Sequence, residues 1–170
     1  MKRNITKSAM IAYTGLFAAL AMIFSYLELL LPINMGIPGA KLGLANIVIV
    51  VVMYVFGDYM AISVNLIRIL WMAVLFGSPM SFAMACFGAI VSYIAMVIAR
   101  LLWRVHAPGV GVCGGVFHNV GQIFAAWIFM GTGLVWYYLP VLMLAGWFTG
   151  LCVGILAQII IHRCSQYKNR

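Results

Sequence analysis

The chain has 170 residues, of which 66% are hydrophobic and 7% are charged, and its mean hydropathy is +1.15. A soluble domain carries roughly 25% charged residues, so the composition excludes one and predicts an all-α, polytopic membrane protein. About six spans of roughly 20 residues fill this length as a single transmembrane domain over residues 1–170. The net charge of +8 lies at the predicted helix ends, so we expect contact with lipid headgroups and not with nucleic acid.

Six apolar runs, separated by glycine, proline or basic residues, predict the transmembrane helices. They cover residues 8–31, 41–56, 59–76, 80–99, 110–130 and 140–161. The first run is longer than the roughly 7–15 apolar residues of a signal peptide, which favours a retained span. The second is short unless residues 41–46 enter the bilayer. Residues 131–138 are expected to form a loop whose Trp and Tyr side chains suit a membrane interface.

Basic residues gather in three short stretches of the sequence. These are Lys2, Arg3 and Lys7, then Arg100 and Arg104, then Arg163, Lys168 and Arg170. With six spans, both termini and the middle stretch share one side of the membrane. The positive-inside rule makes that side cytoplasmic. We therefore expect a multi-pass protein of the cell (cytoplasmic) membrane, with its N and C termini in the cytoplasm.

Small residues recur at helical spacing in two of the predicted spans. Gly146, Gly150 and Gly154 form a stripe on one face of the sixth span, and Gly15 and Ala19 form a shorter one in the first. Small residues at this spacing let two helix backbones approach closely within a membrane. The pattern favours packing inside the bundle, and docking to a separate membrane subunit is the alternative.

Arg68 is the most informative polar residue, because it falls near the middle of the third span. An arginine at the bilayer centre costs on the order of 2.5–3.5 kcal/mol on insertion scales, so it should face the interior and have a partner. Glu28, one turn from the outer end of the first span, is the candidate partner. The fifth span places His118 and Gln122 four residues apart on one face.

Two interpretations of these interior polar residues remain open. In the first, Glu28 pairs with Arg68 and the amides satisfy loose backbone groups. In the second, surplus positive charge and amide donors form a site for an anionic or carbonyl-bearing ligand. Lys41 has a further option, since its side chain could extend to the outer interface. The candidate ligand-binding residues are Lys41, Asn46, Asn65, Arg68, His118, Asn119 and Gln122.

The same residues argue against several kinds of chemistry. His118 has no second histidine at helical spacing, and the two acids, Glu28 and Asp58, are predicted on opposite sides of the membrane, so we expect no metal site. An acidic cluster that would hold magnesium against a diphosphate is missing, and so is a Walker-type motif. We therefore assign no catalytic residue, and enzymatic activity is not predicted.

Four segments resemble a known family: PGAKLGLAN (residues 38–46), Arg68, HNVGQ (118–122) and YLPVLMLAG (138–146). The chain resembles, over nearly its whole length, the heptaprenyl diphosphate synthase component I family, also called the Gx transporter family. That family is similar to the S components of energy-coupling factor transporters. The resemblance implies a six-helix bundle that captures a substrate from outside. It also implies docking through small residues of the first span, such as Gly15 and Ala19.

The resemblance yields one leading hypothesis and two alternatives. The leading hypothesis is a non-catalytic, S-component-like subunit with membrane and ATPase coupling partners. The first alternative is a quinol-linked component of flavin-based extracellular electron transfer, with an outer flavoprotein as partner. In this alternative the cofactor would be a quinone or a noncovalently bound flavin. His118, Asn119 and Gln122 would donate hydrogen bonds to its carbonyl group. The second alternative is an accessory membrane subunit of heptaprenyl diphosphate or menaquinone synthesis.

Overall fold

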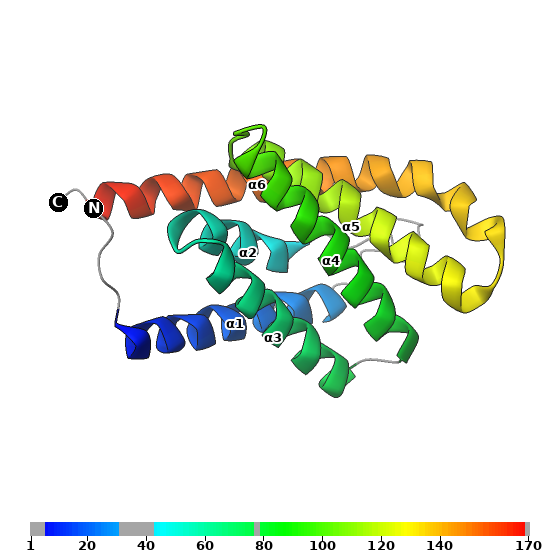
Figure 1. The fold of residues 1–170 in the computed structure, drawn as a ribbon, viewed down its shortest axis with the longest axis horizontal. Helices are drawn as coiled ribbons and strands as arrows, with labels where there is room; N and C mark the ends of the chain where they lie inside the picture. The colour runs from blue at the N-terminus through cyan, green and yellow to red at the C-terminus, as the bar shows by residue number, and fades with distance from the viewer. Residues whose placement is uncertain (1–5, 31–42, 77–78, 169–170) are drawn as a thin grey trace.

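The computed structural model describes residues 6–30, 43–76 and 79–168, and this part of the chain is all-helical, without strands. Figure 1 shows the helices as they follow one another along the chain. They are α1 (Lys7–Leu30), α2 (Leu44–Val55), α3 (Asp58–Phe76), α4 (Pro79–Leu101), α5 (Ala107–Met130), the 3₁₀ helix η1 (Gly133–Tyr138) and α6 (Leu139–Lys168). The prediction of an all-α fold is therefore confirmed for the described residues.

Five of the described helices are long and apolar enough to cross a membrane: α1, α3, α4, α5 and α6. The exception is α2, whose 12 residues span about 18 Å at 1.5 Å per residue. A bilayer core is about 30 Å thick. The predicted second span is thus a shorter helix that begins at Leu44, and residues 41 and 42 lie outside the described residues.

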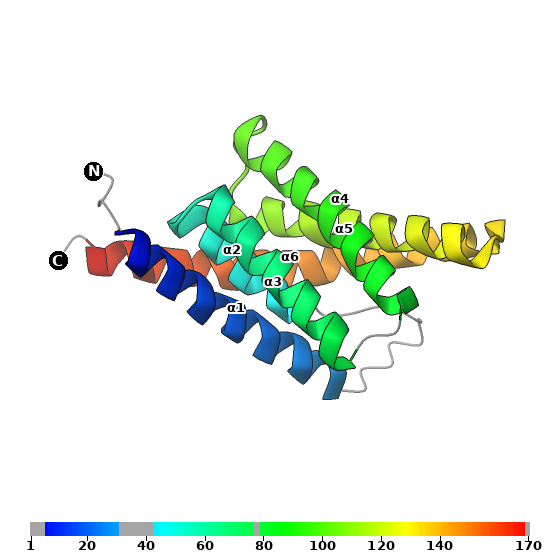
Figure 2. The ribbon, with the colours of Figure 1, turned by 60° about the horizontal axis from the view of Figure 1, so that its bottom comes forward.

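Helix α2 forms the centre of the bundle. Eight of its residues are buried, including the continuous run from Ile47 to Met53. A helix that is hydrophobic on every side is buried, either in lipid or among other protein elements. In agreement, α2 contacts α1, α3, α5 and α6, and Figure 2 shows it behind α1 and α3 and close to α6. Because protein encloses α2, its length need not match the bilayer.

The other helices form two groups on either side of α2. Helices α1 and α3 pack against α2 and against each other, while α5 packs closely against both α4 and α6. Contacts between α3 and α4, which join the two groups, are sparse. Three chain segments lie toward the same end of the bundle in Figure 1: the start of α1, the end of α6, and the connection between α4 and α5. The described basic residues Lys7, Arg100, Arg104 and Arg163 therefore lie toward one end.

Glycines set the close packing of α5 against α6. A Cβ atom added at Gly111 would overlap the carbonyl oxygen of Gly150, and one at Gly115 would overlap that of Gly146. A Cβ at Gly154 would meet Pro108. The glycine stripe of α6 thus faces α5, and it serves helix packing within the chain. By contrast, Gly15 and Ala19 lie on an exposed face of α1, and a Cβ on Gly15 would meet nothing within 4 Å.

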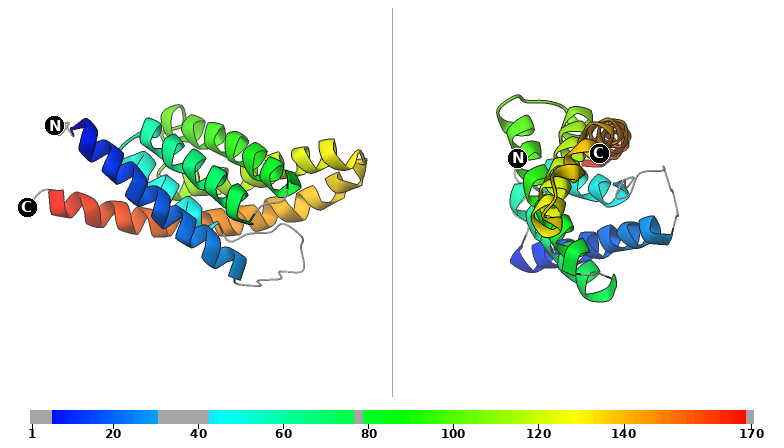
Figure 3. Two further views of the ribbon diagram at one scale, coloured as in Figure 1. Left: turned by 90° about the horizontal axis from the view of Figure 1, so that it is seen from below. Right: turned by 90° about the vertical axis from the view of Figure 1, so that its right-hand side faces the viewer.

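The hairpin of α5 and α6 projects beyond the ends of the other helices, as the left view in Figure 3 shows. Its tip contains η1, so residues 133–138 form a 3₁₀ helix where the sequence predicted a loop. Thr132 caps η1, since its Oγ1 accepts a hydrogen bond from the backbone N–H of Leu134. Trp136 stacks on Trp127 of α5, with ring centroids 6.2 Å apart, which fixes η1 to the end of α5.

Candidate functional site

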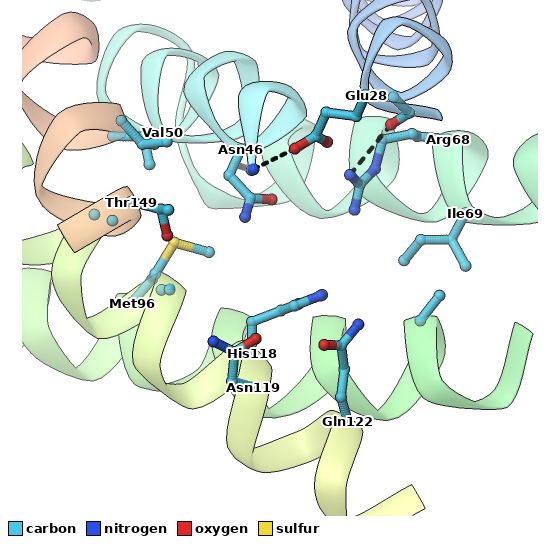
Figure 4. Close-up of a pocket in the computed structure, with 18 of the residues that line it drawn as sticks. Glu28, Asn46, Val50, Arg68, Ile69, Met96, His118, Asn119, Gln122 and Thr149 are labelled. Atoms are coloured by element: carbon cyan, nitrogen blue, oxygen red, sulfur yellow. Dashed lines mark hydrogen bonds between the residues drawn. The ribbon is translucent and has the colours of Figure 1, made fainter. Parts of the chain in front are cut away.

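A cavity of about 200 Å³ lies between the two helix groups. Its described polar lining comes from α1, the start of α2, and α3 on one side, and from α5 and α6 on the other. Figure 4 shows the two sets of side chains facing each other across it. The described residues that carry polar side chains into the lining are Ser25, Glu28, Asn46, Arg68, His118, Asn119, Gln122 and Thr149.

Arg68 reaches the cavity from α3 with part of its hydrogen-bonding capacity unused. Its Nη2 donates to Oδ1 of Asn65 at 2.8 Å, and its Nη1 donates weakly to Oγ of Ser25 at 3.5 Å. Its Nε is buried and has no hydrogen-bond partner in the described part of the chain. Because a guanidinium carries five N–H donors and no acceptor, Arg68 suits an oxyanion or a carbonyl oxygen as a further partner.

Glu28 does not form the expected ion pair with Arg68. Among the described residues no carboxylate oxygen lies within 4.0 Å of a nitrogen of Arg68, although Glu28 is near enough to act on it electrostatically. Oε1 of Glu28 instead accepts hydrogen bonds from the backbone N–H groups of Gly43 and, at 3.2 Å, Leu44. These N–H groups open α2 and have no partner within the helix. The carboxylate thus caps α2 and complements its dipole.

Helix α5 supplies the opposite side of the cavity with His118 and Gln122. Both side chains point toward the cavity in Figure 4. Gly88 of α4 makes room for them, because a Cβ there would lie 2.8 Å from Cε1 of His118 and 3.0 Å from Cγ of Gln122. The amide of Gln122 is 6% exposed and makes no hydrogen bond within the described residues. It is therefore available to a ligand.

Three polar residues near the cavity have structural partners. Asn119 lines the cavity, but its Nδ2 donates to the carbonyl of Leu142 at 2.6 Å and ties α5 to α6. Asn65 was predicted to contact the ligand, yet it is not among the lining residues and serves to hold Arg68. Thr149 was not predicted, and its hydroxyl donates to the backbone of α6.

Asn46 lies in the first turn of α2 and lines the cavity. Its side-chain amide makes no hydrogen bond in the described structure. Lys41, the other residue predicted at this end of the second span, lies outside the described residues. Ser25 joins this side of the cavity as well; it sits one turn before Glu28 on the same face of α1, a spacing that could have revealed it.

A second arginine, Arg100, is held at the end of α4 by an acid, a backbone carbonyl and an aromatic ring. Its Nη2 forms an ion pair with Oδ2 of Asp58 at 2.6 Å, and its Nη1 donates to the carbonyl of Met53. Its Cζ lies 5.7 Å from the centre of the Tyr54 ring. Tyr93 donates to the backbone carbonyl of Asp58 at 2.6 Å. The sequence indicated Arg100 only as part of a basic stretch, and its contacts with Asp58, Met53 and Tyr54 were not predicted.

The size of the cavity limits what it can hold. A cavity of about 150 Å³ accommodates benzene, so 200 Å³ fits on the order of ten non-hydrogen atoms. A single-ring headgroup therefore fits entirely within the described cavity, whereas a three-ring flavin would have to extend beyond it. No group of three or more His, Cys, Asp or Glu side chains that could hold a metal occurs among the described residues. The lining thus offers charge and hydrogen bonds to a small organic molecule.

Comparison with known proteins identifies one family. The family model described as heptaprenyl diphosphate synthase component I matches residues 17–160, a range that includes every described residue of the cavity lining. The resemblance predicted from the sequence is therefore confirmed. No curated protein and no solved structure matches the chain.

Proposed function

The chain belongs to the heptaprenyl diphosphate synthase component I family, and from that premise we propose that it is a membrane subunit that binds a small anionic or carbonyl-bearing ligand. The binding site is the cavity between the two helix groups. Arg68 supplies the charge, and Asn46, His118 and Gln122 orient the ligand. The protein acts as an S-component-like capture subunit that takes up its ligand from the outer side.

One observation carries this proposal: Arg68 lines a cavity, and its buried Nε has no hydrogen-bond partner in the described chain. Burying an unsatisfied charged donor costs several kcal/mol by the usual estimates. A purely structural arginine would be expected to have its N–H groups saturated. Here the nearest acid is occupied at the start of α2, which leaves a ligand as the natural partner.

The capture role also requires a coupling partner. Helix α1 presents Gly15 and Ala19 on an exposed face. No described side chain or backbone of another helix lies within 4 Å of a Cβ placed on Gly15, so this face is not packed against another helix of the described chain there. A membrane partner whose helix packs on small residues could approach the α1 backbone closely there. This face is where we expect the transmembrane coupling subunit to dock, with both termini of the chain on the cytoplasmic side.

The family description names a component of a prenyl diphosphate synthase, and an accessory role in such an enzyme is the competing proposal. The whole sequence contains two acidic residues, and these are Glu28 and Asp58. Each already has a structural partner. Diphosphate chemistry with magnesium needs several carboxylates together, so this chain would contribute binding or membrane attachment and not the catalytic centre.

Native mass spectrometry of the purified protein tests the proposed function. We expect a small molecule to remain bound to the unaltered chain, because the charged cavity retains it through mild purification. The variant Arg68→Gln should lose that molecule. The matched control is Arg163→Gln, which makes the same chemical change at an exposed position of α6 and should retain the ligand.

Two results would count against the function. A protein that releases no small molecule from any mild preparation would not be a capture subunit with high affinity. Equal retention by Arg68→Gln and the unaltered chain would place the bound molecule elsewhere. Identification of the released molecule as a quinone would support the electron-transfer alternative, since His118 and Gln122 would then read its carbonyl.

A further inference from the structure

We infer, on the basis of the proposed function, that the ligand is a small organic monoanion and not a diphosphate. Its oxyanion lies on Arg68, and a carbonyl or amide group at its other end lies against Gln122. Between the two ends it has a compact apolar body. The inference narrows the ligand class and departs from the substrate that the family description suggests.

Charge balance gives the first argument. Among the described residues of the lining, Arg68 is the one permanent cation and Glu28 the one acid. The charge of Glu28 is shared with the positive end of α2 through two backbone N–H groups. A ligand with a single negative charge would neutralise Arg68. A diphosphate would bring further charges that no described cation matches, and Glu28 would repel them at low dielectric.

Hydrogen-bonding direction gives the second argument. At Arg68 only donors are available, and an N–H fork of this kind binds a carboxylate with two parallel hydrogen bonds. On the α5 side, the amide of Gln122 offers both a donor and an acceptor and makes no hydrogen bond within the described chain. A carbonyl or primary amide satisfies such a group. The two ends of the cavity therefore recognise different chemical groups.

Size and apolar lining give the third argument. The remaining surface includes Val50, Ile69, Phe82 and Met96, which favour a hydrocarbon or aromatic body. The volume of about 200 Å³ fits on the order of ten non-hydrogen atoms by comparison with known cavities. A prenyl chain of several isoprene units exceeds this volume. A single ring with a substituent at each end matches it.

Isothermal titration calorimetry of the full chain in lipid nanodiscs tests the inference with four probes. They are 4-carbamoylbenzoate, with a carboxylate and an amide; terephthalamide, its neutral counterpart of the same shape; benzoate, which lacks the amide; and isopentenyl diphosphate. We expect 4-carbamoylbenzoate to bind at least tenfold more tightly than each of the others. Arg68→Gln should remove its advantage over terephthalamide, and Gln122→Leu its advantage over benzoate.

The ranking of probes on the unaltered protein decides the outcome even where a variant misfolds. Tightest binding by isopentenyl diphosphate, equal binding by terephthalamide, or no binding by any probe overturns the inference. The mass-spectrometric experiment separates this failure from that of the proposed function. A released molecule that depends on Arg68 but is a polyanion would refute the ligand class and leave the capture role intact.

Discussion

Arg68 and Arg100 both carry a guanidinium into the helical bundle, but their surroundings differ. Arg100 has an ion pair with Asp58, a hydrogen bond to the carbonyl of Met53 and an aromatic ring at 5.7 Å. Arg68 has one good hydrogen bond, to Asn65, and a buried Nε without a partner in the described chain. Arg100 is thus paired with an acid and has no buried nitrogen without a partner among the described atoms, whereas Arg68 has such a nitrogen and no acid in ion-pair distance.

This difference separates stability from binding. A saturated charge holds helices together, so its removal should destabilise the fold. An unsaturated charge beside a cavity stabilises the fold little, and its removal should change ligand binding instead. Four substitutions test this contrast, in order of decreasing expected effect.

Replacement of Arg100 should give the largest loss of stability. Arg100→Met removes the ion-pair partner of Asp58. Oδ1 of Asp58 already lacks a partner in the described chain, and the Asp58 side chain is only 32% exposed, so water would replace the lost partner incompletely. Breaking a fully buried pair on one side costs about 3 kcal/mol or more; this pair is partly buried, so we expect a smaller loss, about 1–2 kcal/mol, in the free energy of unfolding in detergent. Adding Asp58→Asn should recover part of it. A loss no larger than that of Arg163→Met would show that the ion pair is not structural.

Replacement of Arg68 should have the opposite pattern. Arg68→Gln removes a charge whose Nε is unsatisfied, so the free energy of unfolding should stay within about 1 kcal/mol of the original or rise. Ligand affinity should fall by roughly 10- to 100-fold, the worth of a charged hydrogen bond. Unfolding and calorimetry on the same preparation measure both quantities. A large loss of stability with unchanged affinity would assign Arg68 a structural role.

Replacement of Glu28 should change both the stability of α2 and the charge felt by a ligand at Arg68. Glu28→Gln keeps an oxygen that can accept from Gly43 and Leu44 but removes the negative charge at the start of α2. The cap should weaken by about 1 kcal/mol. An anionic ligand should bind several-fold more tightly, because Arg68 loses its nearby counter-charge. Glu28→Ala, which removes the acceptor as well, should be less stable than Glu28→Gln. Weaker anion binding in Glu28→Gln would mean that the carboxylate itself contacts the ligand.

Gly88 offers the mildest test. In Gly88→Ala the new Cβ would displace the flexible side chains of His118 and Gln122, so affinity should fall a few-fold while stability changes by less than about 1 kcal/mol. Gly133→Ala is the control, since a Cβ there meets nothing within 4 Å. Unchanged binding in Gly88→Ala would indicate that the α5 side chains do not depend on this space.

Much of the fold follows from hydropathy alone, and the site follows in part. The five long helices match predicted spans within a few residues at most ends, although α6 continues to Lys168, because apolar periodicity persists over whole helices. The high cost of burying an arginine predicted a role for Arg68 in the interior, and the four-residue spacing of His118 and Gln122 predicted that they share a helix face. The cavity lining includes all three.

The partners of charged residues could not be predicted in the same way. Asp58 and Arg100 are 42 residues apart, and nothing local in the sequence marks their contact. Glu28 was expected beside Arg68, but the backbone N–H groups that open α2 compete for the same carboxylate. That competition depends on where α2 begins, and hydropathy defines helix ends poorly.

The enclosed position of α2 has a consequence for how the protein is made. Its 12 residues are too few for a stable span of their own, and two of the helices that cover it, α5 and α6, emerge last from the ribosome. During synthesis α2 is therefore not fully enclosed by protein until α5 and α6 have been made. A chain that stops before α6 should leave one side of α2 uncovered, and we expect membrane quality control to degrade it.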